Sequence, residues 1–159
     1  MIKIVAPGKI KENYLKEGIN DYLKRINKYT KIEIIEIKEE NKKEDKANLE
    51  VEAKDILKEL NDKDYVIVLD IKGKNLSSTE LAVKIDDIYN THSNITFVIG
   101  SSSGLDLSVK ERANLLLSFG KNTYPHQVFR FLLLEQIYRA YKINNNERYH
   151  KWIVSGRSS

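Results

Sequence analysis

The stretch ITFVIGSSSGLDLSVKERANLLLSFGKNTYPH, from Ile95 to His126, decides the fold. It contains two short apolar runs, Ile95–Ile99 and Leu115–Ser118, and each run ends in a loop. Apolar runs of this length are typical of buried strands. The loops are residues 100–104, which are all glycine and serine, and residues 119–124. We expect the loops to leave two adjacent strands and to form one crevice, because ligands bind outside the carboxyl ends of strands in an open parallel sheet.

The rest of the chain alternates between patterns of strands and patterns of amphipathic helices. The strand patterns lie at residues 2–6, 31–38 and 65–69, and the helix patterns lie at residues 11–26, from 49 onward, behind residue 77 and from 126 to about 144. Glu39 to Lys46 is strongly charged, and we expect a surface loop there. The alternation predicts an α/β fold with a mainly parallel sheet flanked by helices.

Two serine–glutamate spacings predict where helices begin. Ser77 with Glu80, and Ser108 with Glu111, are each spaced as a capping box. In that motif the serine side chain accepts a hydrogen bond from the third helical amide, and the glutamate accepts one from the amide of the serine. We therefore expect one helix to begin after Ser77 and a short helix to begin after Ser108.

The last predicted helix, from His126 to about Asn144, is apolar almost all round. A helix that is apolar on more than one face has to be buried on more than one side. The sheet covers one side, and in a chain this short a partner subunit is the economical cover for the other. This pattern predicts a homodimer.

Composition limits the class of protein further. The chain has 159 residues, the size of one domain, and no cysteine, which excludes disulfides, thiolate catalysis and zinc–thiolate sites. It begins without a signal-peptide pattern, and we expect a cytoplasmic protein with no membrane span. The three scattered histidines predict no metal site. The net charge of +4 is compatible with a phosphate-rich partner, but it is small for holding naked RNA tightly.

Several candidate site residues have two interpretations on residue type alone. The loop from Gly100 to Gly104 either binds a ligand or is an ordinary strand-to-helix turn, and it lacks the Gly-Lys-Ser/Thr ending of a nucleoside triphosphate loop. Residues 119–124 either wrap a ligand or form a plain connection to the last helix. His126 either moves a proton or only starts that helix.

The C-terminal charged residues also leave alternatives open. Tyr149 and His150 lie in a basic, aromatic segment that suits RNA contact, or they belong to a tail without a role. Glu135 and Arg139 are spaced to pair on one helix face. Alternatively, Arg130 and Arg139 face a crevice at the seam of the dimer.

Four segments together resemble the SPOUT-class methyltransferases, which have a knotted α/β fold. They are VIVLDIKGKNLSS at 66–78, FVIGSSSGL at 97–105, LLSFGKNTYPHQVFRFLLLEQIYRAYKI at 116–143 and RYHK at 148–151. Within that class, they look like the small family that methylates a pseudouridine of large-subunit (23S) ribosomal RNA. The resemblance covers residues 1–151 as a single domain and leaves residues 152–159 as a short C-terminal extension.

The resemblance implies a deep trefoil knot in the C-terminal half, a rare topology. It implies S-adenosylmethionine as the cofactor and a homodimer as the active form. It implies a pseudouridine in the assembled ribosome as the substrate, methylated at N-3. By matching position, the cofactor would be held by Leu69, Gly100, Phe119, Gly120, Lys121, Asn122, Thr123 and Tyr124.

For the reaction, we expect His150 and Tyr149 to contact the target base, and Arg130 and Arg139 to bind phosphate or polarise a carbonyl. His126 is the alternative proton acceptor. The chain departs from the family at Ser101, where a second glycine is usual, and at Gly120, where a serine is usual. These departures support the alternative function, a non-catalytic ribosome- or RNA-binding protein that has kept the fold.

Overall fold

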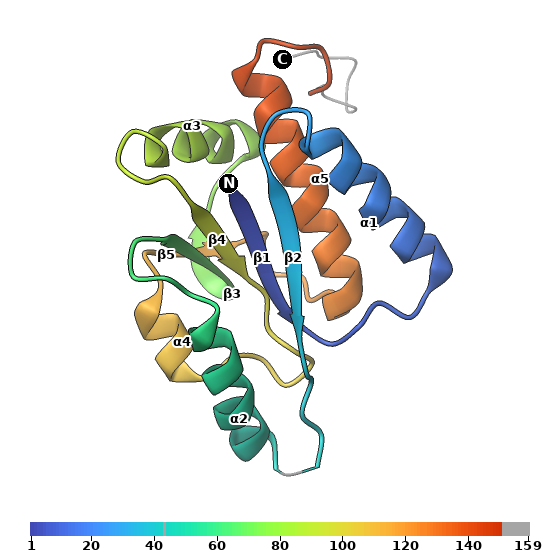
Figure 1. Ribbon diagram of the computed structural model, residues 1–159, viewed down its shortest axis with the longest axis vertical. Coiled ribbons are helices and arrows are strands. Elements are labelled where there is room, and N and C mark those ends of the chain that lie inside the picture. Colours follow the sequence, from blue (N-terminus) through green and yellow to red (C-terminus); the bar gives the residue numbers. More distant parts are fainter. Residues whose placement is uncertain (43, 151–159) are drawn as a thin grey trace.

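The computed structural model describes residues 1–42 and 44–150, which form a five-stranded sheet with helices on both faces (Figure 1). All strand pairs are parallel, and the order across the sheet is β2-β1-β4-β3-β5. The strands are β1 Ile2–Pro7, β2 Ile32–Ile37, β3 Tyr65–Asn75, β4 Ile95–Val98 and β5 Leu115–Ser118. The helices are α1 Asn13–Ile26, α2 Asp45–Lys58, α3 Ser78–Ile88, α4 Leu107–Arg112 and α5 His126–Asn144.

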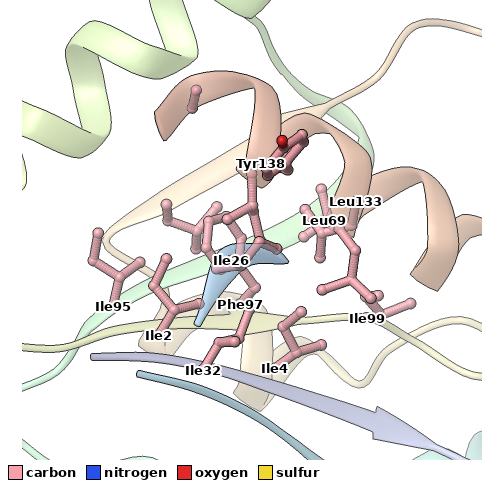
Figure 2. Close-up of a cluster of buried hydrophobic side chains, with 14 of the residues drawn as sticks. Ile2, Ile4, Ile26, Ile32, Leu69, Ile95, Phe97, Ile99, Leu133 and Tyr138 are labelled. Carbon is pink, nitrogen blue, oxygen red and sulfur yellow. The ribbon is translucent and has the colours of Figure 1, made fainter. Parts of the chain in front are cut away.

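Two neighbouring rows of side chains show how the strand sequences build the core. One row crosses the sheet through Ile34, Ile4, Phe97, Ile67 and Leu115, and it packs into the cluster drawn in Figure 2. The next row is Ile35, Val5, Val98, Val68 and Leu116, and it packs into a second cluster with residues of α2 and α4. Successive residues of a strand point to opposite faces, so continuous apolar runs produce two cores.

Most predicted elements are confirmed, and the capping box of Ser77 and Glu80 is present with both of its hydrogen bonds. The second predicted capping box is wrong. Asp106 is the N-cap of α4, and its side chain accepts from the amide of Ser108 at 3.1 Å. An aspartate two residues upstream offers a nearer acceptor, so the serine becomes part of the first turn. Helix α2 begins at Asp45, inside the segment expected to be a charged loop.

The expectation that the two loops leave adjacent strands is also wrong, because β3 lies between β4 and β5. Leu117 of β5 is paired both with Leu69 and with Lys74 of β3. Between these positions Gly73 passes so close to β5 that an added Cβ would lie 2.6 Å from the carbonyl carbon of Leu116. The strand β3 therefore continues past the carboxyl end of its buried part and crosses β5. The trefoil knot itself stays a prediction.

Helix α5 is covered by its own chain on more sides than the sequence analysis expected. It packs on the sheet, and α1 and α3 lie on either side of it (Figure 1). Gly18 of α1 lets the ring of Phe131 approach, since a Cβ at Gly18 would lie 2.5 Å from that ring. The apolar character of α5 thus has an explanation within one chain. In the part of the chain that the structure describes, no helix is long and apolar enough to cross a membrane.

Candidate functional site

A cavity of about 290 Å³ lies at the carboxyl ends of β3, β4 and β5. It is lined by Leu69 from β3, by Gly100 directly after β4 and by Ser118 at the end of β5. The loops after β4 and β5 therefore form one crevice as predicted, but they meet over the end of β3 and do not leave neighbouring strands. The apolar part of the wall includes Leu69, Ile99, Leu105, Leu117 and Phe129.

The loop after β5 presents unused backbone donors at this cavity. Ser118 fixes its start, because its hydroxyl accepts from the amide of Gly120 at 3.1 Å and donates to the carbonyl of Gly120 at 3.0 Å. Gly120 has a φ of +105°, a conformation that favours glycine. Within the described residues, the amides of Lys121 to Tyr124 donate no hydrogen bond. Such a loop is suited to wrapping a ligand with its main chain.

The side chains of this loop divide into two groups. Phe119, Asn122, Thr123 and Tyr124 line the cavity together with the backbone of Gly120, whereas the exposed Lys121 does not. The rings of Phe119 and Tyr124 pack against Phe129 of α5, with centroids 5.1 and 5.9 Å away. This aromatic packing joins both ends of the loop to the first turns of α5.

The loop after β4 is a closed turn. The amide of Ser101 donates to the carbonyl of Gly104 at 3.2 Å, and the amide of Gly104 donates back to the carbonyl of Ser101 at 2.9 Å. A Cβ at Gly100 would lie 2.6 Å from the carbonyl oxygen of Gly104, so this turn requires glycine. Because these two amides are used internally, the turn contributes a compact wall and not a phosphate cradle.

His126, at the start of α5, lies between the main cavity and a polar cleft on its other side. Its Nε2 is 3.5 Å from Oε1 of Glu39, and this buried nitrogen has no hydrogen-bond partner within normal geometry. The residue is therefore placed beside the site, as expected, with a carboxylate as its nearest charged neighbour.

Arg130 is not placed as the sequence analysis expected. It is 1% exposed, and its guanidinium bonds Glu36 at 2.6 Å and the carbonyl oxygens of Pro7 and Gly8 at 3.3 and 3.1 Å. These partners lie at the carboxyl ends of β1 and β2, on the inner side of α5. The expected contact with phosphate is corrected to an internal one, because a guanidinium this deeply buried is not accessible to RNA.

Arg139, Tyr149 and His150 form a second group centred on Glu135. The carboxylate of Glu135 accepts from Nη2 of Arg139 at 2.8 Å and from the hydroxyl of Tyr149 at 2.9 Å. Nη1 of Arg139 lies 3.0 Å from Nδ1 of His150, and its guanidinium lies 4.9 Å from the ring centroid of Tyr149. The predicted pairing of Glu135 with Arg139 is confirmed, and it also organises the two tail residues.

The phenol of Tyr149 is held in its protonated form. Burial raises the pKa of Tyr149 above its ordinary value, and hydrogen bonds with Tyr22 and Glu135 raise it further. Since the neutral phenol remains protonated throughout the neutral pH range, Tyr149 serves as a hydrogen-bond donor and not as a base.

A cleft of about 400 Å³ connects the two groups. It is lined by Phe119, Gly120 and Tyr124 from the loop after β5 and by Glu135 from α5. Phe129 and Glu135 are six residues apart on α5, about 9 Å along the helix axis. Glu135 thus lines the cleft beside the loop and also binds the tail residues, whereas Arg130 lines neither the cavity nor this cleft.

Comparison with known proteins identifies the family of this chain. Residues 1–150 match the family model described as "Predicted SPOUT methyltransferase". The chain belongs to the SPOUT methyltransferase family. It is 50% identical over 157 residues to the "Ribosomal RNA large subunit methyltransferase H" of Enterococcus faecalis, covering 94% of this chain and 99% of that protein. It is 51% identical over 158 residues, with the same two coverages, to the protein of that name from Carboxydothermus hydrogenoformans.

A solved SPOUT methyltransferase supports the fold at much lower identity. The crystal structure of a ribosomal RNA small subunit methyltransferase E from Neisseria gonorrhoeae, bound to S-adenosyl methionine, superposes with a TM-score of 0.50 at 11% identity. The match covers 84% of this chain and 63% of that one. At this identity the likeness concerns the architecture alone.

Several residues of this SPOUT cavity were not singled out by the sequence. Ser118, Leu117 and Phe129 line it, and Lys110 lies there with its Nζ 3.3 Å from Oδ2 of Asp70. For Leu117 and Ser118 the available signal was their position at the end of a strand, and for Phe129 it was its position one helical turn after His126. No group of three or more histidine, aspartate or glutamate side chains suited to a metal ion occurs among residues 1–42 and 44–150.

Proposed function

We propose that this SPOUT methyltransferase transfers a methyl group from S-adenosylmethionine to N-3 of a pseudouridine in large-subunit (23S) ribosomal RNA, within cytoplasmic ribosomes. The observation that carries the proposal is identity near 50% over 94% of the chain to proteins named for large-subunit ribosomal RNA methylation. The cavity at the strand ends also supports the proposal, since its lining residues are suited to binding the methyl donor that the reaction needs.

The residues of the cavity fit S-adenosylmethionine. An adenine ring suits the apolar wall of Leu69, Ile99 and Leu117, and its ring nitrogens are acceptors for backbone amides. The amides of Lys121 to Tyr124, which donate nowhere else in the described part of the chain, are such donors. Bound there, the cofactor supplies an electrophilic methyl group on a sulfonium. Lys121 would contribute through its main chain, because its side chain does not line the cavity.

The tail group is suited to stabilising a deprotonated uracil ring. Methylation replaces the hydrogen on N-3, so one proton leaves and negative charge develops on the neighbouring carbonyl oxygens. A guanidinium only donates, so the contact with Arg139 makes Nδ1 of His150 the acceptor. The proton of a neutral His150 then lies on Nε2, which makes this residue a donor toward a carbonyl. Tyr149 donates its one hydroxyl proton to Glu135 and so holds that carboxylate beside Arg139, and His126 remains the candidate that accepts the proton.

Methyl transfer assays with ribosomes test the function. Purified ribosomes that lack the modification, and free ribosomal RNA, are incubated with the protein and radiolabelled S-adenosylmethionine, and the nucleosides are then analysed. We expect label in N-3-methylpseudouridine from ribosomes and much less from free RNA, because the net charge of +4 gives little grip on naked RNA. Absence of S-adenosylmethionine binding in calorimetry, with retained ribosome binding, would favour the non-catalytic alternative.

His150→Ala is expected to lower the rate of methyl transfer by about 100-fold, the scale of losing one donor to a developing oxyanion. Binding of S-adenosylmethionine should be unchanged, because His150 does not line the cofactor cavity. His92→Ala is the matched control, since His92 lies in the loop before β4 and contacts Thr91 and Tyr65. Full activity in the His150 variant would remove this residue from the mechanism.

We propose also that the active form is a homodimer. The cleft between the loop after β5 and α5 opens at the surface and contains the apolar side chains of Leu76, Tyr124 and Leu132, with Tyr124 39% exposed. A second copy would cover these side chains. We expect sedimentation equilibrium to give twice the 18.5 kDa of one chain at micromolar concentration. A mass of one chain at that concentration would contradict the dimer.

A further inference from the structure

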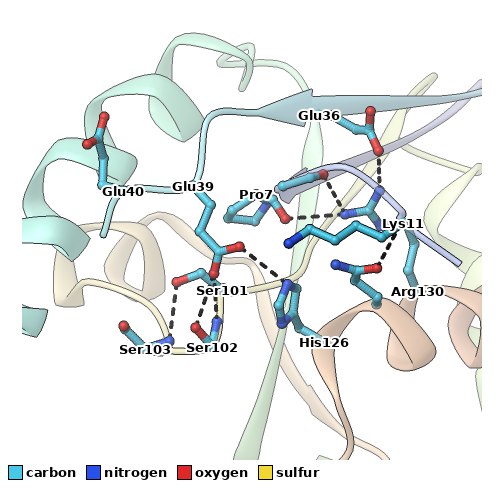
Figure 3. A network of polar contacts seen from close by, with 12 residues as sticks. Pro7, Lys11, Glu36, Glu39, Glu40, Ser101, Ser102, Ser103, His126 and Arg130 are labelled. Carbon is cyan, nitrogen blue, oxygen red and sulfur yellow. Dashed lines mark hydrogen bonds and ion pairs between the residues drawn. The ribbon is translucent and has the colours of Figure 1, made fainter. Parts of the chain in front are cut away.

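The segment that joins β2 to α2, with the first turns of α2, holds the closed turn after β4 from outside. Three successive serines of that turn each donate to a different carboxylate, and the pair of Ser102 and Glu39 is drawn in Figure 3. The pairs are Ser101 with Glu52 at 2.8 Å, Ser102 with Glu39 at 3.1 Å and Ser103 with Asp45 at 3.2 Å. Segments about 50 to 60 residues apart in the sequence are thereby joined at the edge of the cofactor cavity.

Glu39 differs from the other two carboxylates because it also contacts α5. Its Oε2 accepts from the hydroxyl of Ser102, and its Oε1 lies 3.5 Å from Nε2 of His126 (Figure 3). The turn after β4, through Ser101 and Gly104, and His126 both line the cavity, whereas Glu39 and Ser102 line the polar cleft beside it. One side chain therefore connects the wall after β4 to the start of α5.

The side chain of Glu39 lies close to the turn after β1. Gly8 has a φ of +87°, and a Cβ there would come within 3.0 Å of Oε1 of Glu39 and 3.8 Å of Nε2 of His126. Arg130 anchors this turn by donating to the carbonyl oxygens of Pro7 and Gly8. The buried arginine, the glycine turn and Glu39 thus form a continuous support for His126.

We propose that Glu39 is a positioning residue of the methyl-donor site, whose carboxylate holds the β4 turn and His126 at the spacing that S-adenosylmethionine requires. The inference rests on the proposed cofactor. Hydrogen bonds to a carboxylate are about twice as strong as neutral ones, and Glu39 makes its contacts before any ligand arrives. Without it, binding would have to order both walls, and the cost of that ordering would appear as lost affinity.

Calorimetry with S-adenosylmethionine on the full chain tests the assignment. We expect Glu39→Ala to raise the dissociation constant about tenfold, which corresponds to a coupling of about 1.4 kcal/mol. Glu39→Gln keeps an oxygen that accepts from Ser102, so we expect it to recover most of the affinity. Ser102→Ala removes only the hydrogen bond from the serine hydroxyl of the β4 turn to Glu39, and it should raise the dissociation constant about threefold. Glu50→Ala is the matched control, because Glu50 is an exposed carboxylate of α2 with no contact to the turn.

A kinetic measurement separates positioning from a general structural role. The Glu39→Ala enzyme should show a raised KM for S-adenosylmethionine and a kcat within about threefold of wild type, because saturating ligand restores the arrangement of the walls. An unchanged dissociation constant in Glu39→Ala, or an equal loss in Glu50→Ala, would overturn the inference alone. A wild-type chain that does not bind S-adenosylmethionine would overturn the proposed cofactor and the inference together.

Discussion

Gly73→Ala is expected to lower the free energy of unfolding by about 3 kcal/mol, the upper end of the usual cost of overpacking. The new Cβ would lie 2.6 Å from the carbonyl carbon of Leu116, 2.7 Å from its oxygen and 2.8 Å from the amide nitrogen of Leu117. All these atoms belong to the backbone of β5, the edge strand that pairs with β3. Neither strand can move aside without breaking pairs between β3 and β5.

Urea denaturation of the Gly73→Ala and Gly120→Ala variants separates crowding from backbone conformation. Gly120 has a φ of +105°, but a Cβ there would meet nothing within 4 Å. Gly120→Ala should therefore cost only about 1 kcal/mol, the strain of a left-handed conformation in a residue with a side chain. Equal losses in the two variants would mean that the crossing of β3 over β5 is looser than its contacts indicate.

The sequence predicted the elements of the fold well because their signals are local. The apolar run from Tyr65 to Leu69 is a buried strand, and the helix expected from His126 to about Asn144 has those bounds in the structure. The order of strands was not predictable in this way. That β3 separates β4 from β5 follows from contacts between distant segments, and periodicity within a strand contains no information about its neighbours.

The candidate site shows the same division. That the loop from Phe119 to Tyr124 lines a crevice at the strand ends was predicted, because ligands bind outside the carboxyl ends of parallel strands. Glu39 was expected only in a charged surface loop, since nothing near it in the sequence signals a role. Its partners, Ser102 and His126, are 63 and 87 positions away. The role of a carboxylate in a charged segment can be recognised only after the fold has brought such partners next to it.

The interpretation of Arg130 failed for a related reason. Arg130 was expected to face a crevice at the seam of the dimer and to bind phosphate or polarise a carbonyl. Charged side chains are almost never fully buried unless they are paired. The structure provides the pair, Glu36, together with two carbonyl oxygens at the end of β1. The sequence gives no warning that a turn at Pro7 and Gly8 needs a donor, since that need arises only after α5 has packed against it.

Arg130→Met is therefore expected to lower the free energy of unfolding by about 3 kcal/mol, the lower end of the cost of removing one partner of a buried pair. The lower end applies because the Glu36 side chain is 37% exposed and can be hydrated, whereas the two backbone carbonyls would lose their donor inside the protein. Arg130→Lys should recover only part of the loss, since one ammonium group cannot reach all three acceptors as a guanidinium does.

Arg139→Met is the matched comparison, because both arginines lie on α5 and each pairs with a glutamate. Arg139 is 21% exposed and touches the tail, so its loss should cost less than about 1 kcal/mol in urea denaturation while lowering methyl transfer to ribosomes strongly. The two variants should thus show opposite profiles, one losing stability and the other losing activity at the same cofactor affinity. If Arg130→Met kept wild-type stability and lost only ribosome methylation, the phosphate-binding role would be restored to it. The same result would show that the turn after β1 does not depend on its guanidinium.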